Sequence, residues 1–288
     1  RKLYFRSKKM RKEIGIIGYP LGHTMSPTIH ESAFNKLGLD MKFNIWETKP
    51  ENLEQVIHNL RNNNILGSCV TLPHKFEVMN FLDELDETAV EMKAVNWIVN
   101  DDGKLVGHNT DWEGFTKSLD FINYNIQNKI SLILGAGGSA KAVCMSLIKG
   151  ESKKIYIYNR TKANSTNLVE NFSKYKNRIN IIEKNNLEDP KFLNDIDIII
   201  NTTSLGMTGG PNPSISPINT DIINKNALCY DLVYSPSITP FLNGAMKNNI
   251  KYLGGLSMLV FQAALGFKLT TKLDPPIANM LKSVGIES

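Results

Sequence analysis

The sequence predicts an α/β protein of two domains, each built around a largely parallel sheet. Short apolar runs alternate with segments of helical periodicity through most of the 288 residues. One such run, residues 132–134, enters a glycine-rich turn that is followed by a helical pattern. The length suffices for two domains of ordinary size, each with its own core. Alternating strands and helices favour parallel pairing, which places ligands at the carboxyl ends of the strands.

The first third of the chain carries the first set of elements. Strands are expected at residues 13–18, 41–47, 65–70, 95–100 and 105–106, the last two joined by a turn at 101–104. Helices are expected at residues 27–37 and 50–61. Ser26 is the expected N-cap of the first helix, with Pro27 at its first position and Gly38 just past its end.

The remaining two thirds repeat this alternation. Further buried strands are expected at residues 155–158, 196–201 and 228–233, and a loop near the cofactor at 206–217. Residues 257–272 place Met258, Phe261, Leu265 and Leu269 at helical spacing. We expect this C-terminal helix to return to the first domain.

The glycine-rich turn has the pattern of a Rossmann-type pyrophosphate site. A buried strand, a turn of the form G-x-G-x-x-A and a helix start direct backbone N–H groups at a pyrophosphate. The residues expected there are Gly135, Ala136, Gly137, Gly138, Ser139 and Ala140. After the next strand come Asn159, Arg160, Thr161 and Lys162, where an NAD-binding unit would carry an acidic residue. Basic side chains suit a 2′-phosphate, so the sequence predicts an NADP-binding domain.

Composition and charge exclude several classes of function. The formal charge of +5 comes from seven Lys and Arg residues within residues 1–12; without them, 26 of the 33 basic residues remain against 28 acidic ones. The charge therefore predicts neither a nucleic-acid partner nor a membrane surface. The three cysteines form no C-x-x-C pair and the five histidines no H-E-x-x-H motif, so no metal is expected. We expect a cytoplasmic protein, with no signal peptide or membrane span.

Three polar clusters follow apolar strands of the first domain. They are residues 20–27, 69–75 and 107–111, which carry hydroxyls, an amide, a lysine and an aspartate suited to a polyhydroxylated ligand. Each also has a purely structural interpretation. Thr24 and Ser26 could cap a helix, Lys75 could be a solvated lysine at a helix start, and Asp111 could be a helix N-cap.

Together these motifs resemble the shikimate dehydrogenase family. The matches run in order from Ile14 to about Leu269. They comprise Gly18–Pro27, Val70–Lys75, Ala94–Asn96, Asn109–Asp111, Gly135–Ala140, Asn159–Thr161, Asn201–Met207, Asp231–Pro236 and Gly254–Gln262. The resemblance implies NADP-dependent interconversion of 3-dehydroshikimate and shikimate, in the biosynthesis of chorismate and aromatic amino acids. It implies no macromolecular partner beyond a possible second copy, so we expect a monomer or a homodimer.

The same resemblance implies a role for individual residues. Lys75 and Asp111 match the catalytic pair that assists proton transfer. Substrate-binding positions are matched by Thr24, Ser26, Thr71, Asn96 and Gln262, with Thr24 standing where the family usually has serine. Neighbours of the cofactor's ribose and nicotinamide are matched by Thr202, Leu232, Tyr234, Gly255 and Met258, of which Met258 could equally be a core residue.

These motifs and the resemblance predict three segments. Residues 1–12 are expected to be a disordered basic tail or the remnant of an expression tag. Residues 13–111 together with 256–288 are expected to form the substrate-binding catalytic domain. Residues 112–255 are expected to form the NADP-binding domain.

Two residues depart from the family pattern. Cys69 stands where many members carry asparagine, and Trp97 where threonine usually follows the Ala-Val-Asn element. They could alter the substrate pocket, or Cys69 could pack as a small apolar residue and Trp97 face away from the pocket. Quinate or an amino-shikimate therefore stays an alternative substrate. A catalytically idle NADP-binding regulator is a weaker alternative, because it leaves Lys75, Asp111 and Gln262 unexplained. A methylene-tetrahydrofolate type of dehydrogenase is also weaker, because it leaves Thr24, Ser26 and residues 109–111 unexplained.

Overall fold

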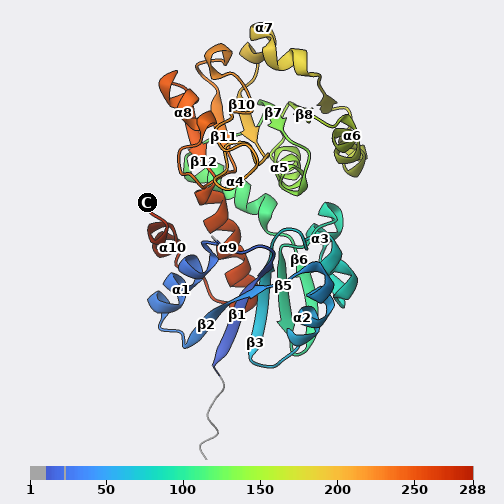
Figure 1. Cartoon of the computed structure of the whole chain (residues 1–288), viewed down its shortest axis with the longest axis vertical. Coiled ribbons are helices and arrows are strands. Elements are labelled where there is room, and N and C mark those ends of the chain that lie inside the picture. Colours follow the sequence, from blue (N-terminus) through green and yellow to red (C-terminus); the bar gives the residue numbers. More distant parts are fainter. Residues whose placement is uncertain (1–10, 23, 288) are drawn as a thin grey trace, which may run out of the picture. The chain divides into compact units, whose positions relative to one another are not determined.

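The computed structural model describes residues 11–22 and 24–287 (Figure 1). They fall into two compact units: residues up to Thr110 with those from Ala263 onward, and residues Asp111–Gln262. Asp111 and residues 256–262 thus belong to the second unit, whereas the predicted boundaries put them in the first. The reason is that one helix begins at Asp111 and another, α9 (Leu256–Thr271), runs through the second boundary.

The first unit is built on a six-stranded sheet with the order β2-β1-β3-β5-β6-β4. Only β5 runs against the others, since β3 and β6 both pair with it in antiparallel fashion. Its strands are β1 (Lys12–Gly18), β2 (Met41–Glu47), β3 (Ile65–Val70), β4 (Glu84–Leu85), β5 (Trp97–Asp101) and β6 (Lys104–His108). The mostly parallel sheet predicted from the sequence is confirmed, and β2 and β3 have the predicted bounds.

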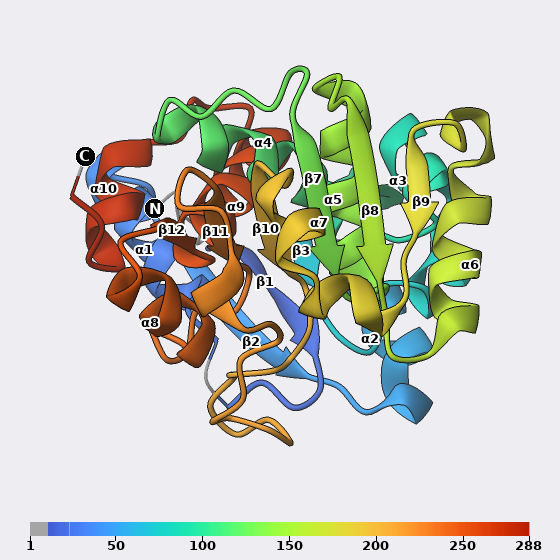
Figure 2. The same ribbon diagram turned by 90° about the horizontal axis from the view of Figure 1, so that it is seen from above.

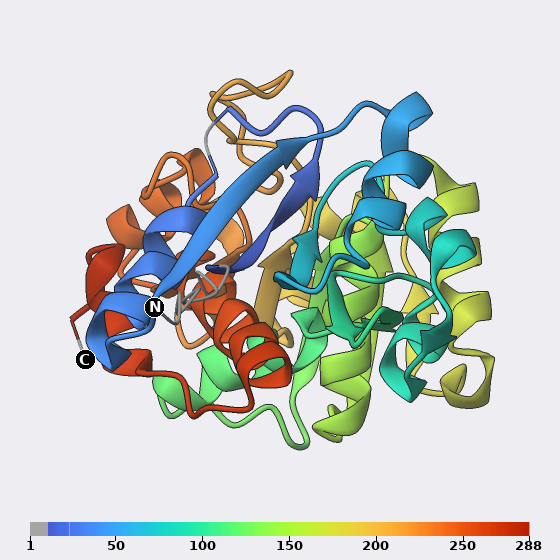
Figure 3. The ribbon, with the colours of Figure 1, turned by 90° about the horizontal axis from the view of Figure 1, so that it is seen from below.

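Helices cover both faces of this first sheet. They are α1 (Ser26–Leu37), α2 (Leu53–Asn59), α3 (Glu87–Met92) and α10 (Ile277–Ser283), with 3₁₀ turns at Pro50–Asn52 and Glu77–Phe81. Leu53 and Ile57 of α2 and Ala89 of α3 form one core cluster with Ile17 and Ile98 of the sheet. On the other face α1 packs beside α10 (Figure 3). The helix predicted at 50–61 is a 3₁₀ turn followed by a shorter α-helix.

Two sequence predictions near the N-terminus need correction. The predicted tail lies outside the described residues up to residue 10, but Lys12 already begins β1 and Arg11 forms an ion pair with Asp40 at 2.9 Å. Ser26 is the first residue of α1 and not its N-cap, which is Met25. The Thr24 hydroxyl instead accepts the backbone N–H of Ser26 at 3.3 Å, so a local turn replaces the expected cap.

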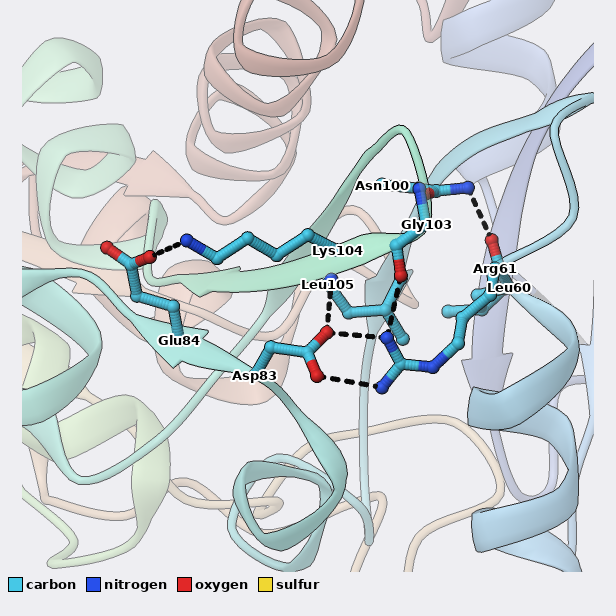
Figure 4. Close-up of polar contacts among 8 residues, drawn as sticks. All are labelled: Leu60, Arg61, Asp83, Glu84, Asn100, Gly103, Lys104 and Leu105. Carbon is cyan, nitrogen blue, oxygen red and sulfur yellow. Dashed lines mark hydrogen bonds and ion pairs between the residues drawn. The ribbon is translucent and has the colours of Figure 1, made fainter.

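An ion-pair cluster lies at the β5–β6 hairpin (Figure 4). Arg61 donates to both carboxylate oxygens of Asp83, at 2.5 and 3.1 Å, and to the carbonyl of Gly103 at 2.7 Å. Asp83 also accepts the backbone N–H of Leu105, and Lys104 forms an ion pair with Glu84. These contacts tie the end of α2, strand β4 and the hairpin together.

A fully buried histidine lies between the first sheet and its helices. His30 of α1 is stacked on Phe43, with ring centroids 4.9 Å apart, and lies 5.5 Å from the Trp97 ring. Within the described part of the chain neither ring nitrogen has a hydrogen-bond partner. Burial lowers the pKa of His30 from 6.5 to about 3.

We expect His30 to make the protein less stable in acid. The unfolded chain binds a proton near pH 6.5, and the folded protein does so only near pH 3. The free energy of unfolding therefore decreases as the pH is lowered from about 6.5 to about 3, by up to about 1.4 kcal/mol per pH unit. His30→Phe keeps the stacking and removes the titration. Urea unfolding between about pH 6 and pH 4 should show a flatter pH dependence in this variant; equal slopes would contradict the assignment.

The second unit is built on an all-parallel sheet with the order β12-β11-β10-β7-β8-β9 (Figure 2). This is the doubly wound order of dinucleotide-binding domains, and its direction reverses between β7 and β10. The strands are β7 (Ile130–Leu134), β8 (Lys154–Tyr158), β9 (Ile179–Ile181), β10 (Ile198–Asn201), β11 (Leu228–Asp231) and β12 (Lys251–Gly254). The Rossmann-type fold expected from the glycine-rich motif is confirmed.

Helices again cover both faces of this second sheet. They are α4 (Asp111–Phe121), α5 (Gly138–Lys149), α6 (Lys162–Asn171), α7 (Pro190–Asn194), α8 (Pro240–Lys247) and the first part of α9. Short 3₁₀ turns lie at Ser173–Tyr175, Lys184–Glu188 and Thr220–Ile222. One face packs residues such as Leu134 and Ile199 against Phe241 of α8. On the other face Phe115 of α4 stacks on Tyr230, with ring centroids 4.9 Å apart.

Candidate active site

The predicted substrate-binding residues of the first unit meet at one edge of its sheet. Strands β1, β3 and β6 run in the same direction and therefore end at that edge, where the antiparallel β5 begins. Thr71 follows β3 and Asn96 precedes β5. Asn109, which belongs to the third polar cluster, follows β6 at the same edge. Ser26 belongs to the segment that follows β1. The topology thus explains why residues from separate motifs can bind one ligand.

Asn96 is the centre of this edge. Its backbone bridges the neighbouring strands, donating to the carbonyl of His108 at 3.0 Å and accepting the N–H of Val70 at 2.8 Å. Its side-chain oxygen accepts the N–H of Thr110 at 2.7 Å, and its amide donates to the Thr110 hydroxyl at 3.0 Å. Asn96 and Thr110 are both buried. Asn96 therefore fixes the chain between β6 and Asp111, besides its predicted role with substrate.

Lys75 lies in the turn between β3 and the 3₁₀ segment that starts at Glu77. Its carbonyl accepts the N–H of Val95 at 2.7 Å, which holds this backbone next to Asn96. Thr71 donates its N–H to the carbonyl of Ile17 at 2.9 Å, so the first residue of the turn is hydrogen-bonded to the neighbouring strand β1. Lys75 is half-buried, in contrast to a fully solvated lysine at a helix start.

Helix α4, which begins at Asp111, packs closely against Gln262 of α9 within the second unit. Asp111 begins α4, and Gly114 lies one turn further along that helix. A Cβ atom on Gly114 would lie 2.7 Å from Cβ of Gln262 and 2.9 Å from its backbone nitrogen. Only glycine therefore allows α4 and α9 to approach this closely. The pairing of Asp111 with Lys75 stays a prediction.

The glycine-rich turn leaves the N-terminus of α5 open. Gly135 has φ +113°, and a Cβ atom there would lie 2.4 Å from Oγ1 of Thr202. Among the residues that the structure describes, a Cβ atom on Gly137 or Gly138 would meet nothing within 4 Å, and no side chain caps the helix. Free space in front of an uncapped helix start, at the point where the strand order reverses, fits a pyrophosphate group.

The basic turn after β8 places Arg160 in an exposed position. The side-chain amide of Asn159 donates to the carbonyl of Thr161 at 2.9 Å and so closes the turn. Arg160 is exposed at its tip, and Thr161 is the N-cap residue of α6. Lys162 forms an ion pair with Glu183 at 2.6 Å, although both side chains are largely exposed. Of the two basic residues, Arg160 therefore fits a 2′-phosphate better.

The other predicted cofactor neighbours follow the carboxyl ends of β10, β11 and β12, except Met258, which lies on α9. Thr202 donates both its N–H and its hydroxyl to the carbonyl of Leu134, each at 2.8 Å. A Cβ atom on Gly255 would lie 2.1 Å from the carbonyl oxygen of Leu232, which requires glycine there. Burial raises the pKa of Tyr234 above its ordinary value. Met258 is buried on α9, which is compatible with a core role as well as with a cofactor contact.

The sequence motifs contain a buried carboxylate whose structural role was not predicted. Asp231 accepts the side-chain amide of Asn201 at 2.9 Å, the hydroxyl of Thr239 at 2.6 Å and the N–H of Val233 at 3.0 Å. Burial raises its pKa to about 6, against the lowering effect of these hydrogen bonds. Asp231 thus ties together the loops that follow β10 and β11. Among residues 11–22 and 24–287 no His, Cys, Asp or Glu cluster could hold a metal.

The two departures from the family pattern lie in the core of the first unit. Trp97 is fully buried and donates its indole N–H to the Thr270 hydroxyl at 2.7 Å. Cys69 is buried, and its thiol donates to the carbonyl of Gly15 at 3.3 Å. These contacts favour the interpretation that both residues pack in the core of the first unit. No helix in the described part of the chain is long and apolar enough to cross a membrane.

Two family models and several curated proteins match this chain. Residues 16–98 match the family described as shikimate dehydrogenase substrate binding domain, and residues 119–216 match shikimate / quinate 5-dehydrogenase. The shikimate dehydrogenase (NADP(+)) of Caldanaerobacter subterraneus is 40% identical over 90% of this chain and 91% of that protein. The corresponding enzyme of Bacillus subtilis is 38% identical over 94% and 95%.

Solved structures of similar fold carry the same family name. Shikimate 5-dehydrogenase from Listeria monocytogenes, in complex with shikimate and NAD, has a TM-score of 0.87 and 32% identity, over 96% of this chain and 97% of that chain. The Thermus thermophilus enzyme, in complex with NADP(H) and shikimate, has a TM-score of 0.85 and 29% identity, over 95% and 98%. The chain is therefore an enzyme of the NADP-dependent shikimate dehydrogenase family.

Proposed function

We propose that this protein interconverts 3-dehydroshikimate and shikimate with NADP as cofactor, in the cytoplasm and on the route to chorismate and the aromatic amino acids. The observation that carries the proposal is the pair of strand-edge sites. The first sheet presents Thr71, Asn96 and Asn109 at one edge, and the second presents an open helix start followed by Arg160. The family and its curated NADP(+) members support the same reaction.

The chemistry requires a proton at the substrate oxygen. Bound NADPH would supply hydride to the ring carbonyl carbon. The carbonyl oxygen then gains negative charge, which a nearby ammonium stabilises and a proton neutralises. We assign this task to Lys75 with Asp111, which act as a pair; in the reverse direction the pair accepts the proton of the shikimate hydroxyl. Thr24, Ser26, Thr71, Asn96 and Gln262 are proposed to bind the substrate's polar groups.

A four-way assay tests the proposed reaction. The purified protein is mixed with shikimate or quinate and with NADP⁺ or NAD⁺, and the absorbance of the reduced nicotinamide is followed. Shikimate with NADP⁺ should give the highest kcat/KM. A preference for quinate would select that substrate instead. Tight NADP binding without turnover of either polyol would favour the idle regulator.

We expect Arg160→Ala to weaken NADP selectively. A guanidinium makes charge-assisted, bidentate hydrogen bonds to a phosphate; for the exposed Arg160 we expect them to contribute about 1.5–3 kcal/mol together. The KM for NADP⁺ should therefore rise about 10- to 100-fold, at about 1.4 kcal/mol per tenfold, while the KM for NAD⁺ changes little. Arg160→Lys keeps the charge but lacks the planar fork, so its effect should be intermediate. An unchanged ratio of the two KM values in Arg160→Ala would refute the 2′-phosphate assignment.

A further inference from the structure

One carboxylate of the first unit joins three groups next to the predicted active site. Asp86 accepts the N–H of Ala89 at 2.8 Å, which makes it the N-cap of α3, and the hydroxyl of Thr88 at 2.6 Å. Its second oxygen lies 2.6 Å from Nδ1 of His108. Because a carboxylate can only accept, the His108 ring must carry its proton on Nδ1. The His108 and Asp86 side chains are 16% and 31% exposed.

Asp86 also holds the backbone at the end of β6, through its own N–H and through Thr88. The backbone N–H of Asp86 donates to the carbonyl of Gly107 at 3.0 Å. The Thr88 hydroxyl, whose proton goes to Asp86, accepts the N–H of Asn109 at 3.1 Å. Asp86 therefore orients the side chain of His108 directly and the backbone of Asn109 through Thr88.

Buried hydrogen bonds also fix Asn109 and Thr110, the two residues that precede Asp111. The side-chain amide of Asn109 donates to the carbonyl of Ala94 at 2.9 Å, and the N–H of Thr110 donates to Asn96 at 2.7 Å. Asn109 and Thr110 are 3% and 5% exposed. The next residue is Asp111, the first residue of α4. Hydrogen bonds thus connect the Asp86 carboxylate to Asn109 through Thr88 and fix Thr110, and Asp111 follows Thr110 directly along the chain.

The Asp86 carboxylate is ionised at neutral pH. Burial raises its pKa, but the hydrogen bonds from His108, Thr88 and the backbone of Ala89 outweigh burial, so the pKa lies below its ordinary value. Losing one partner leaves a partly buried charge with an unfilled hydrogen-bond position, which costs more than an average surface contact.

We infer that Asp86 and His108 form a positioning pair that holds the segment Asn109–Asp111 in place for catalysis. The inference rests on the proposed function, in which Asp111 assists proton transfer. Neither residue touches the reacting atoms in this account. They act by fixing the backbone from which Asp111 extends, and a displacement of about 1 Å in such a group can cost about 100-fold in rate.

Three variants test the pair. His108→Leu removes the hydrogen bond, whereas His108→Asn places an amide N–H near the position of Nδ1 and should restore it. Asp86→Ser keeps a good N-cap residue for α3 but does not reach His108. His108→Leu and Asp86→Ser should lower kcat for shikimate about 10- to 100-fold, more than they raise KM. His108→Asn should retain most of the wild-type kcat, and NADP affinity should stay unchanged in all three.

A second measurement on the same variants does not depend on activity. Hydrogen exchange at the amides of Asn109 and Thr110 should accelerate in His108→Leu and Asp86→Ser, and remain slow in His108→Asn. Wild-type exchange in His108→Leu would overturn the inference, as would faster exchange with an unchanged kcat. If the wild-type protein fails to oxidise shikimate, the proposed function fails. The positioning role in catalysis then falls with it, while exchange still shows whether the pair holds this segment.

Discussion

Replacing Lys75 with alanine is expected to lower kcat for shikimate oxidation by about 10²–10⁴-fold, the range that a positioned acid–base group contributes. The ammonium is the charge proposed to lie nearest the substrate oxygen, and alanine can neither stabilise nor protonate it. NADP affinity should hardly change, because the proposed cofactor residues belong to the second unit and Lys75 to the first. Steady-state kinetics and cofactor titration measure both quantities.

Two variants serve as controls for the Lys75 experiment. Lys42→Ala removes an exposed lysine from the edge strand β2 of the same sheet and should leave kcat unchanged. Asp111→Asn should lower kcat, and the double variant with Lys75→Ala should be little worse than either single variant, since the two groups act as a unit. Near-normal turnover of Lys75→Ala would remove Lys75 from the proposed mechanism.

Replacing Gly266 with alanine is expected to destabilise the first unit, even though alanine is the better helix former. Gly266 lies on α9 against the Trp97 ring, and a Cβ atom there would be 2.3 Å from Cδ2 and Cε3. Neither the indole nor the helix can move freely, because Trp97 is fully buried and hydrogen-bonded to Thr270. Overpacking of this kind costs about 1–3 kcal/mol or more, against a propensity gain of up to about 1 kcal/mol.

Urea unfolding measures this loss of stability. The same substitution at Gly138, where a Cβ atom meets nothing within 4 Å, is the matched control and should be neutral or slightly stabilising. In a Trp97→Phe background, Gly266→Ala should cost less, because the smaller ring leaves room for the methyl group. An unchanged free energy of unfolding for Gly266→Ala would show that Trp97 does not pack as described.

The fold could be predicted well where the signal is local. Strands 41–47 and 65–70 are short apolar or alternating runs bounded by turn residues, and both have the predicted bounds. The prediction of a helix at 50–61 is only partly right, because Pro50 starts a 3₁₀ turn and the α-helix ends at Asn59. Strand β4 has two residues and pairs only with β6, so its sequence carries almost no signal of its own.

Parts of the site could be predicted for the same reason and others could not. Parallel strands bring Thr71 and Asn109 to one edge, so their positions after apolar runs were informative. The place of Trp97 depends on Gly266 and Thr270, far away in the sequence, and no local pattern reveals it. Asp86 and His108 are separated by 22 residues and pair through tertiary structure alone.

The most direct test of hydride transfer between shikimate and NADP follows a deuterium label from the substrate to the cofactor. Shikimate carrying deuterium on the carbinol carbon that becomes the ketone is oxidised by the wild-type protein with NADP⁺. Direct hydride transfer places one deuterium per turnover at C4 of the nicotinamide ring of NADPH, as measured by mass spectrometry. Formation of unlabelled NADPH, or no NADPH at all, would contradict direct hydride transfer between shikimate and NADP.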